Sequence, residues 1–303
     1  MRTLHATPAQ AAATHYARRR RRSRMMRATV VYGILVAISM VFLLPFVWMI
    51  LSALKTRSEV LLFPPTIIPR EFHFANFAEA WNFPGMQFGR WTLNTLIISA
   101  AVLIGVLLTS SLCAYGFARI RFPGRDFWFM ATIASIMLPP QVTLIPLYIL
   151  FLKIGWLNSF KPLIIPAWFG GGALNIFLLR QFFLQIPAEL EDAAYIDGAN
   201  RLQIWWRIFL PLSLPALLTV AIFTFQSTWN DFYGPLIFLT GRENYTLSIG
   251  INLFYGSMVA GATGSEIQYM MAIAFLMTLP MIVVFFLAQR YFIGGIVLTG
   301  VNR

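Results

Sequence analysis

Four of the eleven acidic residues of this chain lie within nine consecutive positions: Glu189, Glu191, Asp192 and Asp197. Pro187 suits the first position of a helix, so the first three carboxylates fall in its opening turns, where they oppose the positive end of the helix dipole. Asp197 and Gly198 form a strong turn signal, because glycine readily adopts the positive φ that closes a helix. A second amphipathic segment follows, up to Leu210-Pro211. The stretch predicts two short helices that lie outside the membrane, joined by a glycine turn whose small residues would let a partner approach. The alternative is an ordinary helix hairpin that lies at the membrane interface and binds no partner.

A second polar segment, Thr224 to Gly234, interrupts an otherwise apolar stretch. Polar groups are costly against lipid, so these side chains should face the protein interior or a water-filled cavity. They either form hydrogen bonds that fix helix packing or line a translocation path. Gly234-Pro235 can interrupt the helix and open a cavity there. The second reading assigns the path to Asn94, Ser227, Trp229, Asn230 and Asp231.

The sequence predicts no enzyme chemistry. The three histidines, His5, His15 and His73, are scattered without metal-ligand spacing, and the lone Cys113 lies inside an apolar run. No apolar stretch contains His, Cys and Glu at catalytic spacing. We therefore expect no catalytic residue and no metal site.

The composition indicates a polytopic membrane protein with an all-α fold. Of the 303 residues, 58% are hydrophobic and 11% are charged, whereas charged residues make up about a quarter of a soluble domain. The net charge of +12 comes largely from an N-terminal tail and short loops. Charge in those places orients membrane helices, so we do not expect nucleic-acid binding.

Apolar stretches of about 20 residues can cross a hydrocarbon core of about 30 Å. The first of them is longer than the core of a signal peptide and has no convincing cleavage site, so we expect it to be retained. The chain then divides into a basic cytoplasmic tail, 1–27, and a six-span domain, 28–303. The six predicted spans are Ala28–Leu54, Leu93–Ala118, Phe127–Phe151, Leu163–Leu184, Leu212–Leu239 and Tyr269–Phe292.

The distribution of basic residues predicts the orientation. Sixteen of the 23 Lys and Arg residues fall on the side of the N-terminus, eight of them in the tail. The positive-inside rule places both termini, and the acidic stretch, in the cytoplasm. Two long loops, Lys55–Thr92 and Thr240–Gln268, then lie outside, and loops of this length often have a docking role.

The stretch "ELEDAAYIDGANRLQIWWRIFLPL" resembles the EAA loop of the permease subunits of binding-protein-dependent ABC importers. The matching residues are Asp192-Ala193-Ala194, Asp197-Gly198-Ala199 and Leu210-Pro211, with Asp192 where the family usually has Glu. Four further segments resemble the carbohydrate-uptake branch, and in particular its six-span maltose-permease-like subunit. These segments are "ARIRFPGRD", "FLLRQFFLQIP", "TWNDFYGPLIFL" and "GGIVLTGVNR".

The resemblance implies that residues 186–211 form coupling helices that dock into a separate ATPase. Because no Gly-Lys dipeptide occurs in the sequence, this chain lacks the phosphate-binding Walker A motif. ATP and Mg²⁺ would therefore be used by the partner ATPase, and we expect no cofactor on this chain. The implied partners are a second related permease, an ATPase dimer, an extracytoplasmic binding protein and membrane lipid. The residues assigned to coupling are Glu191, Asp192, Ala193, Ala194, Asp197, Gly198 and Ala199.

The predicted function is thus a multi-pass subunit of the cell inner membrane that imports a sugar, an oligosaccharide or a related compound such as a glycerol phosphate. Along the path, polar groups would meet sugar hydroxyls and aromatic rings would meet sugar rings. The alternative is a secondary transporter driven by an ion gradient, with Asp231 as its ion site. That alternative leaves the cytoplasmic loop unexplained.

Overall fold

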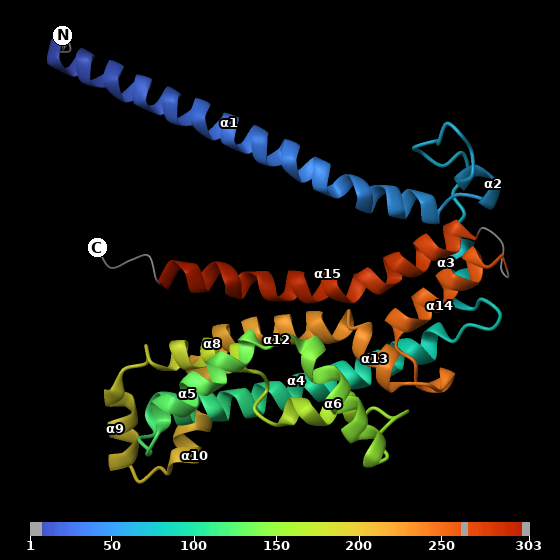
Figure 1. Cartoon of the computed structure of the whole chain (residues 1–303). Coiled ribbons are helices and arrows are strands. Elements are labelled where there is room, and N and C mark those ends of the chain that lie inside the picture. The colour runs from blue at the N-terminus through green and yellow to red at the C-terminus, as the bar shows by residue number, and fades with distance from the viewer. Residues whose placement is uncertain (1–7, 262–265, 299–303) are drawn as a thin grey trace.

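The computed structural model describes residues 8–261 and 266–298, and all regular elements in these ranges are helices. The long helices run roughly side by side (Figure 1). At one end lie α9 (Ala188–Ile196) and α10 (Arg201–Ile204), and we call it the α9 end. At the other end lies α14 (Leu247–Val259), and we call it the α14 end.

One side of the molecule consists of α1 (Pro8–Ala53) and α15 (Ile267–Leu298). Helix α1 contains the predicted tail from residue 8 onward together with the first span, and residues 1–7 and 299–303 lie outside the described part. The rings of Phe46 and Phe275 join α1 to α15 with their centres 6.0 Å apart. From Met25 onward, most apolar side chains of α1 are exposed, as expected for a helix in contact with lipid.

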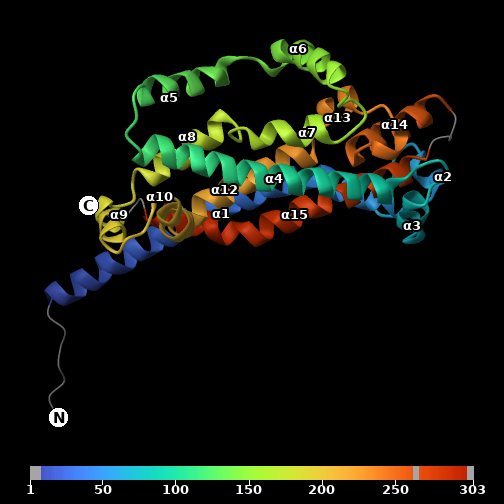
Figure 2. The same ribbon diagram turned by 90° about the horizontal axis from the view of Figure 1, so that it is seen from below.

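The centre of the molecule is α4 (Phe88–Arg119), which packs against α8 (Ala173–Phe183) and α12 (Leu214–Trp229) (Figure 2). Ile98, Val102 and Val106 of α4 recur every four residues, so they form one buried face. Together with side chains of α8, α12 and the α9 end they form one hydrophobic core. This helix therefore connects both ends of the molecule.

The third and fourth predicted spans are interrupted helices. The third consists of α5 (Arg125–Ala134), continued by η1 (Ser135–Met137), and of α6 (Pro140–Lys153). These parts meet at 99°, and the prolines at 139 and 140 explain the bend, because proline disfavours a helical residue before it. The fourth consists of α7 (Lys161–Ile164), η2 (Ile165–Trp168) and α8.

The first long loop is folded onto the α14 end, where it contains α2 (Arg57–Val60) and α3 (Ala75–Trp81). Lys55 is 2% exposed, and its ammonium lies 4.7 Å from the ring centre of Trp48. Glu59 Oε1 accepts hydrogen bonds from Thr66 Oγ1 at 2.9 Å and from the backbone N–H of Arg70 at 3.0 Å. Burial raises the pKa of Glu59, but these two bonds and the nearby charges of Lys55 and Arg70 together outweigh it, so this pKa lies below its ordinary value.

The structure confirms an all-α fold with four apolar helical stretches long enough to cross a membrane, one of them α7, η2 and α8 taken together. There are up to six such stretches if each of two bent pairs is one span. The fifth predicted span, Leu212–Leu239, is interrupted, as expected from Gly234-Pro235, and the break falls slightly earlier, at residues 230–232. Helix α12 ends at Trp229, and a separate helix, α13 (Tyr233–Phe238), follows. Pro235 explains the break, because inside a continuous helix its ring would clash with the carbonyl group of Asp231. In the first turn of α13 the same proline is tolerated.

Gly171 provides a test of how closely the helices pack. Its φ is +65°, and a Cβ atom there would lie 2.8 Å from Val106 O and 3.0 Å from Ser110 Cβ on α4. We expect Gly171→Ala to lower the yield of folded protein in detergent and its melting temperature, because overpacking costs about 1–3 kcal/mol. Gly155→Ala is the matched control, since Gly155 has a φ of +69° and no atom within 4 Å of such a Cβ. Equal losses in both variants would assign the effect to φ alone.

Candidate functional site

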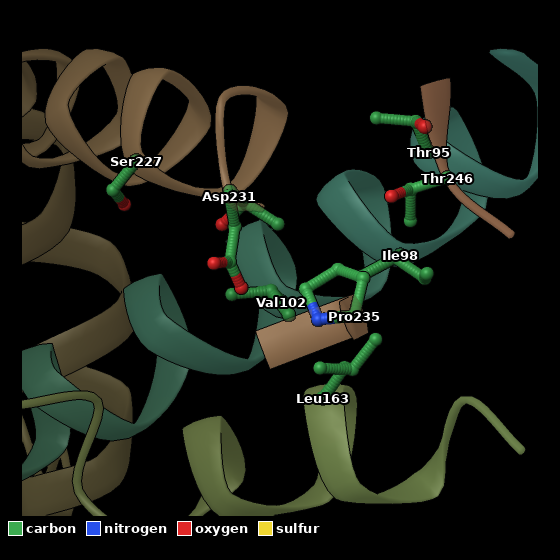
Figure 3. Close-up of a pocket in the computed structure, with 9 residues that line it drawn as sticks. Thr95, Ile98, Val102, Leu163, Ser227, Asp231, Pro235 and Thr246 are labelled. Carbon is green, nitrogen blue, oxygen red and sulfur yellow. The ribbon is translucent and has the colours of Figure 1, made fainter. Parts of the chain in front are cut away.

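A cavity of about 320 Å³ lies where α4, α7, α12, α13 and the start of α14 meet. Figure 3 shows Ser227 and Asp231 on one side and Thr95 and Thr246 on the other, with Leu163 closing a third side. The full set of lining residues is Thr95, Ile98, Val102, Leu163, Ser227, Thr228, Asp231, Pro235 and Thr246. The lining therefore combines hydroxyl groups and one carboxyl group with apolar walls.

Asp231 lies in the break between α12 and α13, which allows its carboxyl group to point into the cavity (Figure 3). Its Oδ1 accepts a hydrogen bond from the backbone N–H of Gly234 at 3.1 Å. Its backbone carbonyl accepts one from Ser248 Oγ at 2.6 Å, which ties the break to α14. Asp231 therefore both starts α13 and supplies the only ionisable side chain among the lining residues.

Three of the four hydroxyl groups that line the cavity donate their hydrogens to backbone carbonyls. Ser227 Oγ and Thr228 Oγ1 each donate to the carbonyl oxygen of Thr224 at 2.9 Å, and Thr95 Oγ1 donates to Trp91 O at 2.8 Å. A hydroxyl has one hydrogen and two lone pairs, so what remains for a ligand is acceptor capacity. At Thr95 one lone pair is already used, because its Oγ1 accepts the backbone N–H of Leu247 at 2.9 Å. The cavity thus offers acceptors to a ligand that donates hydrogen bonds.

Of the five residues predicted for the path, the structure brings Ser227 and Asp231 together in the cavity and places the other three elsewhere. Asn94 is buried, and its Nδ2 donates to the carbonyls of Glu243 and Tyr245, both at 2.9 Å. Trp229 is 1% exposed and its indole N–H donates to Met277 O at 3.0 Å. Asn230 is exposed, with its Nδ2 bonded to its own helix.

Two polar residues that line the cavity, Thr95 and Thr246, have no role predicted from the sequence, and neither have the apolar Ile98, Val102 and Leu163. The sequence of α4 does contain a pattern that predicts Thr95: Thr95, Ile98 and Val102 are spaced by three and four positions and therefore share one helix face. No comparable signal exists for Thr246, which precedes α14 in a long loop. Its place in the cavity depends on how that loop folds back.

At the α9 end, the predicted helix, glycine turn and second helix are all present. Helix α9 ends in a turn in which Gly198 has a φ of +81°. The N–H of Gly198 donates to Tyr195 O at 3.0 Å and that of Ala199 to Ala194 O at 2.9 Å, as in a Schellman motif. After the turn, Asn200 and Gln203 form a reciprocal capping box that starts α10. The second segment then continues as a short π-helix, Trp205–Phe209, and α11, Leu210–Leu212.

The seven predicted coupling residues divide into an exposed and an inward set. Asp192, Ala193, Asp197 and Gly198 are exposed. Ala194 and Ala199 pack against the central hydrophobic core, so their small size serves packing within this chain. Glu191 also turns inward, with a side chain that is 12% exposed. The loop thus exposes carboxylates on its outer surface, while Ala194, Ala199 and Glu191 hold its inner surface against the rest of the chain.

Comparison with known proteins identifies the family. Residues 101–296 match the family described as binding-protein-dependent transport system inner membrane component. The probable ABC transporter permease protein YurM of Bacillus subtilis is 33% identical over 259 residues, covering 83% of this chain and 81% of the relative. The trehalose/maltose transport system permease protein MalG of Thermococcus litoralis is 31% identical over 268 residues, covering 88% and 93%.

A solved structure shares the fold. The crystal structure of a bacterial ABC transporter involved in the import of the acidic polysaccharide alginate contains a chain that matches with a TM-score of 0.77. At 23% identity, the match covers 89% of this chain and 98% of that one. With the helical spans and the α9 end described above, these matches show that the chain belongs to the family of inner-membrane permease components of binding-protein-dependent ABC importers.

Proposed function

We propose that this chain forms part of the import path for a neutral sugar or oligosaccharide and couples that path to a separate ATPase. One observation carries the proposal: the polar cavity and the α9 end are joined by the same two helices, α4 and α12 (Figure 1). Residues near the start of α4 and the end of α12 line the cavity, whereas the α9 end packs on the other end of both. A movement of the α9 end can thus reach the cavity through two continuous helices.

The chemistry of the cavity supports a neutral cargo. Its free acceptors suit the hydroxyl donors of a sugar, and its single charge is the carboxyl group of Asp231. An anionic cargo such as a glycerol phosphate would meet acceptors and a like charge, with no Lys, Arg or His among the lining residues. The name of the relative from Thermococcus litoralis, a trehalose/maltose permease, agrees with a neutral saccharide.

The exposed carboxylates of the α9 end support docking to an ATPase that carries ATP and Mg²⁺, with no cofactor and no catalytic role on this chain. Asp192 and Asp197 are available to basic residues of such a partner. A second related permease would complete the path. The charge bias supports a cytoplasmic location for both termini. The α14 end then faces outward, where exposed Leu61, Phe63 and Ile67 support contact with the binding protein.

Purification of the tagged chain from its native membrane tests the proposal. We expect a stoichiometric ATPase and a second permease to co-purify. After reconstitution with the binding protein, sugar uptake should continue when proton and sodium gradients are collapsed at constant ATP. Uptake that stops under those conditions, without a bound ATPase, would favour the gradient-driven alternative.

A further inference from the structure

Arg119, the last residue of α4, contacts two other segments at the α9 end. Its Nη2 donates hydrogen bonds to the backbone carbonyls of Phe183, at 2.7 Å, and Ile186. Its guanidinium carbon lies 5.0 Å from the ring centre of Phe209 in the π-helix. A cation at the last carbonyls of α8 is also favoured by the helix dipole. One side chain thus holds α4, α8 and the second coupling segment together.

Glu191 approaches the same place from α9. Its Oε1 accepts a hydrogen bond from the hydroxyl of Tyr115, a residue of α4 that is 3% exposed, at 3.2 Å. The hydroxyl of Tyr195 lies 3.4 Å from the same oxygen. The other oxygen, Oε2, lies 3.9 Å from Nε of Arg119, and both charged side chains are 12% exposed. Glu191 therefore connects the first coupling helix to α4.

The contact between the two charges is incomplete. A distance of 3.9 Å is too long for a hydrogen bond, and Nε of Arg119 is buried without a hydrogen-bond partner among the described residues. Burying an unpaired donor is unfavourable, so the site favours any movement that pairs it. An approach of α9 toward α4 by about one ångström would form a charge-assisted hydrogen bond.

We propose that Tyr115, Arg119 and Glu191 form a latch that transmits movement of the coupling loop to α4. The three are positioning residues, and the inference rests on the proposed function. The latch does not contact the ATPase directly. Asp192 is exposed and available for docking, whereas the neighbouring Glu191 faces inward. From Arg119, α4 reaches Thr95 in the cavity over 24 residues, or about 36 Å of helix. Closing the latch would thus displace one wall of the cavity.

Glu191→Gln tests the latch in the complete complex, reconstituted with its ATPase, second permease and binding protein. We expect the ATPase to stay bound and the number of sugar molecules imported per ATP hydrolysed to fall about tenfold, as for the loss of one hydrogen bond to a charged group. Tyr115→Phe removes one hydroxyl group and should lower the same ratio about threefold. Because both residues act through one carboxylate, their effects should not be additive.

Two further variants distinguish a role of Glu191 in the latch from a role in ATPase docking and from a general effect of losing a tyrosine hydroxyl. Asp192→Asn should weaken ATPase binding, and Glu191→Gln should not. Tyr269→Phe is the matched control, because Tyr269 also donates to a carboxylate, Glu79 Oε2 at 2.6 Å, but at the α14 end. It should leave the ratio unchanged.

Three results would contradict the latch. Loss of the ATPase in Glu191→Gln would make Glu191 a docking residue. An unchanged ratio in assembled Tyr115→Phe and Glu191→Gln complexes would leave the cluster a purely structural role. A fall of similar size in Tyr269→Phe would show that the effect is not specific to the latch. Absence of any ATPase from the unmodified complex would instead overturn the proposed function, independently of the latch.

Discussion

Replacing Gly198 by valine is expected to abolish most ATP-driven uptake while the chain still inserts into the membrane. Gly198 has a φ of +81°, and a β-branched residue is strained there by about 1–3 kcal/mol. No atom lies within 4 Å of a Cβ at this position, so the backbone, and not crowding within the chain, causes the effect. The turn between α9 and α10 would rearrange and displace the docking surface. Uptake, binding-protein-stimulated ATP hydrolysis and the amount of bound ATPase should all fall, by about tenfold for uptake.

Gly155→Val is the control for this variant. Gly155 has a φ of +69° and an equally open surrounding, but it lies in the turn between α6 and α7, far along the chain from the coupling loop. Valine at position 155 introduces a similar backbone strain, so uptake per assembled complex should stay near the value of the unmodified protein. If Gly198→Val also retained both uptake and stimulated hydrolysis, the assignment of the loop to ATPase coupling would be wrong.

The second large effect is expected for Asp231→Asn, which should lower sugar uptake about tenfold through lost charge-assisted hydrogen bonds. Assembly and basal ATP hydrolysis should be preserved. Asparagine keeps an oxygen that can accept the hydrogen bond from the Gly234 N–H, so the start of α13 is retained. Initial uptake rates and co-purified ATPase are the measurements.

The matched control for this variant is Asp126→Asn, a surface aspartate whose side chain is 81% exposed and pairs with Arg125. It should leave uptake unchanged. Unchanged uptake in Asp231→Asn would instead restrict Asp231 to capping α13 and fixing its packing. An equal loss in both variants would point to a general effect of the charge change on the complex.

The sequence was most informative where structure depends on neighbouring residues. Span length follows from continuous apolar stretches, and the turn at Gly198 follows from the conformational freedom of glycine, so both were predictable. The break after Trp229 depends on Pro235, which acts on the carbonyl group four residues before it. Hydrophobicity alone continues the span to Leu239, whereas Gly234-Pro235 predicts an interruption within it.

What could not be predicted depends on residues far apart in the chain. Asn94 looked available for a cargo, but the carbonyls that occupy its amide group are about 150 positions later, at Glu243 and Tyr245. Glu191 was grouped with the docking carboxylates, although its orientation is set by Tyr115, 76 positions earlier. Only the packing of α4 against the later helices brings these groups together.

Helix α4 runs for 32 residues without a proline, and this continuity has a consequence for how such permeases diversify. Thr95, which lines the cavity, and Arg119, at the last residue of the helix, are about 36 Å apart along it, well beyond the 7–10 Å over which substitutions usually interact. The residues that line the cavity can therefore be exchanged without changing those that contact the coupling loop. Transferring the cavity-lining residues of another permease to this chain is thus expected to change the imported compound while the original ATPase is retained.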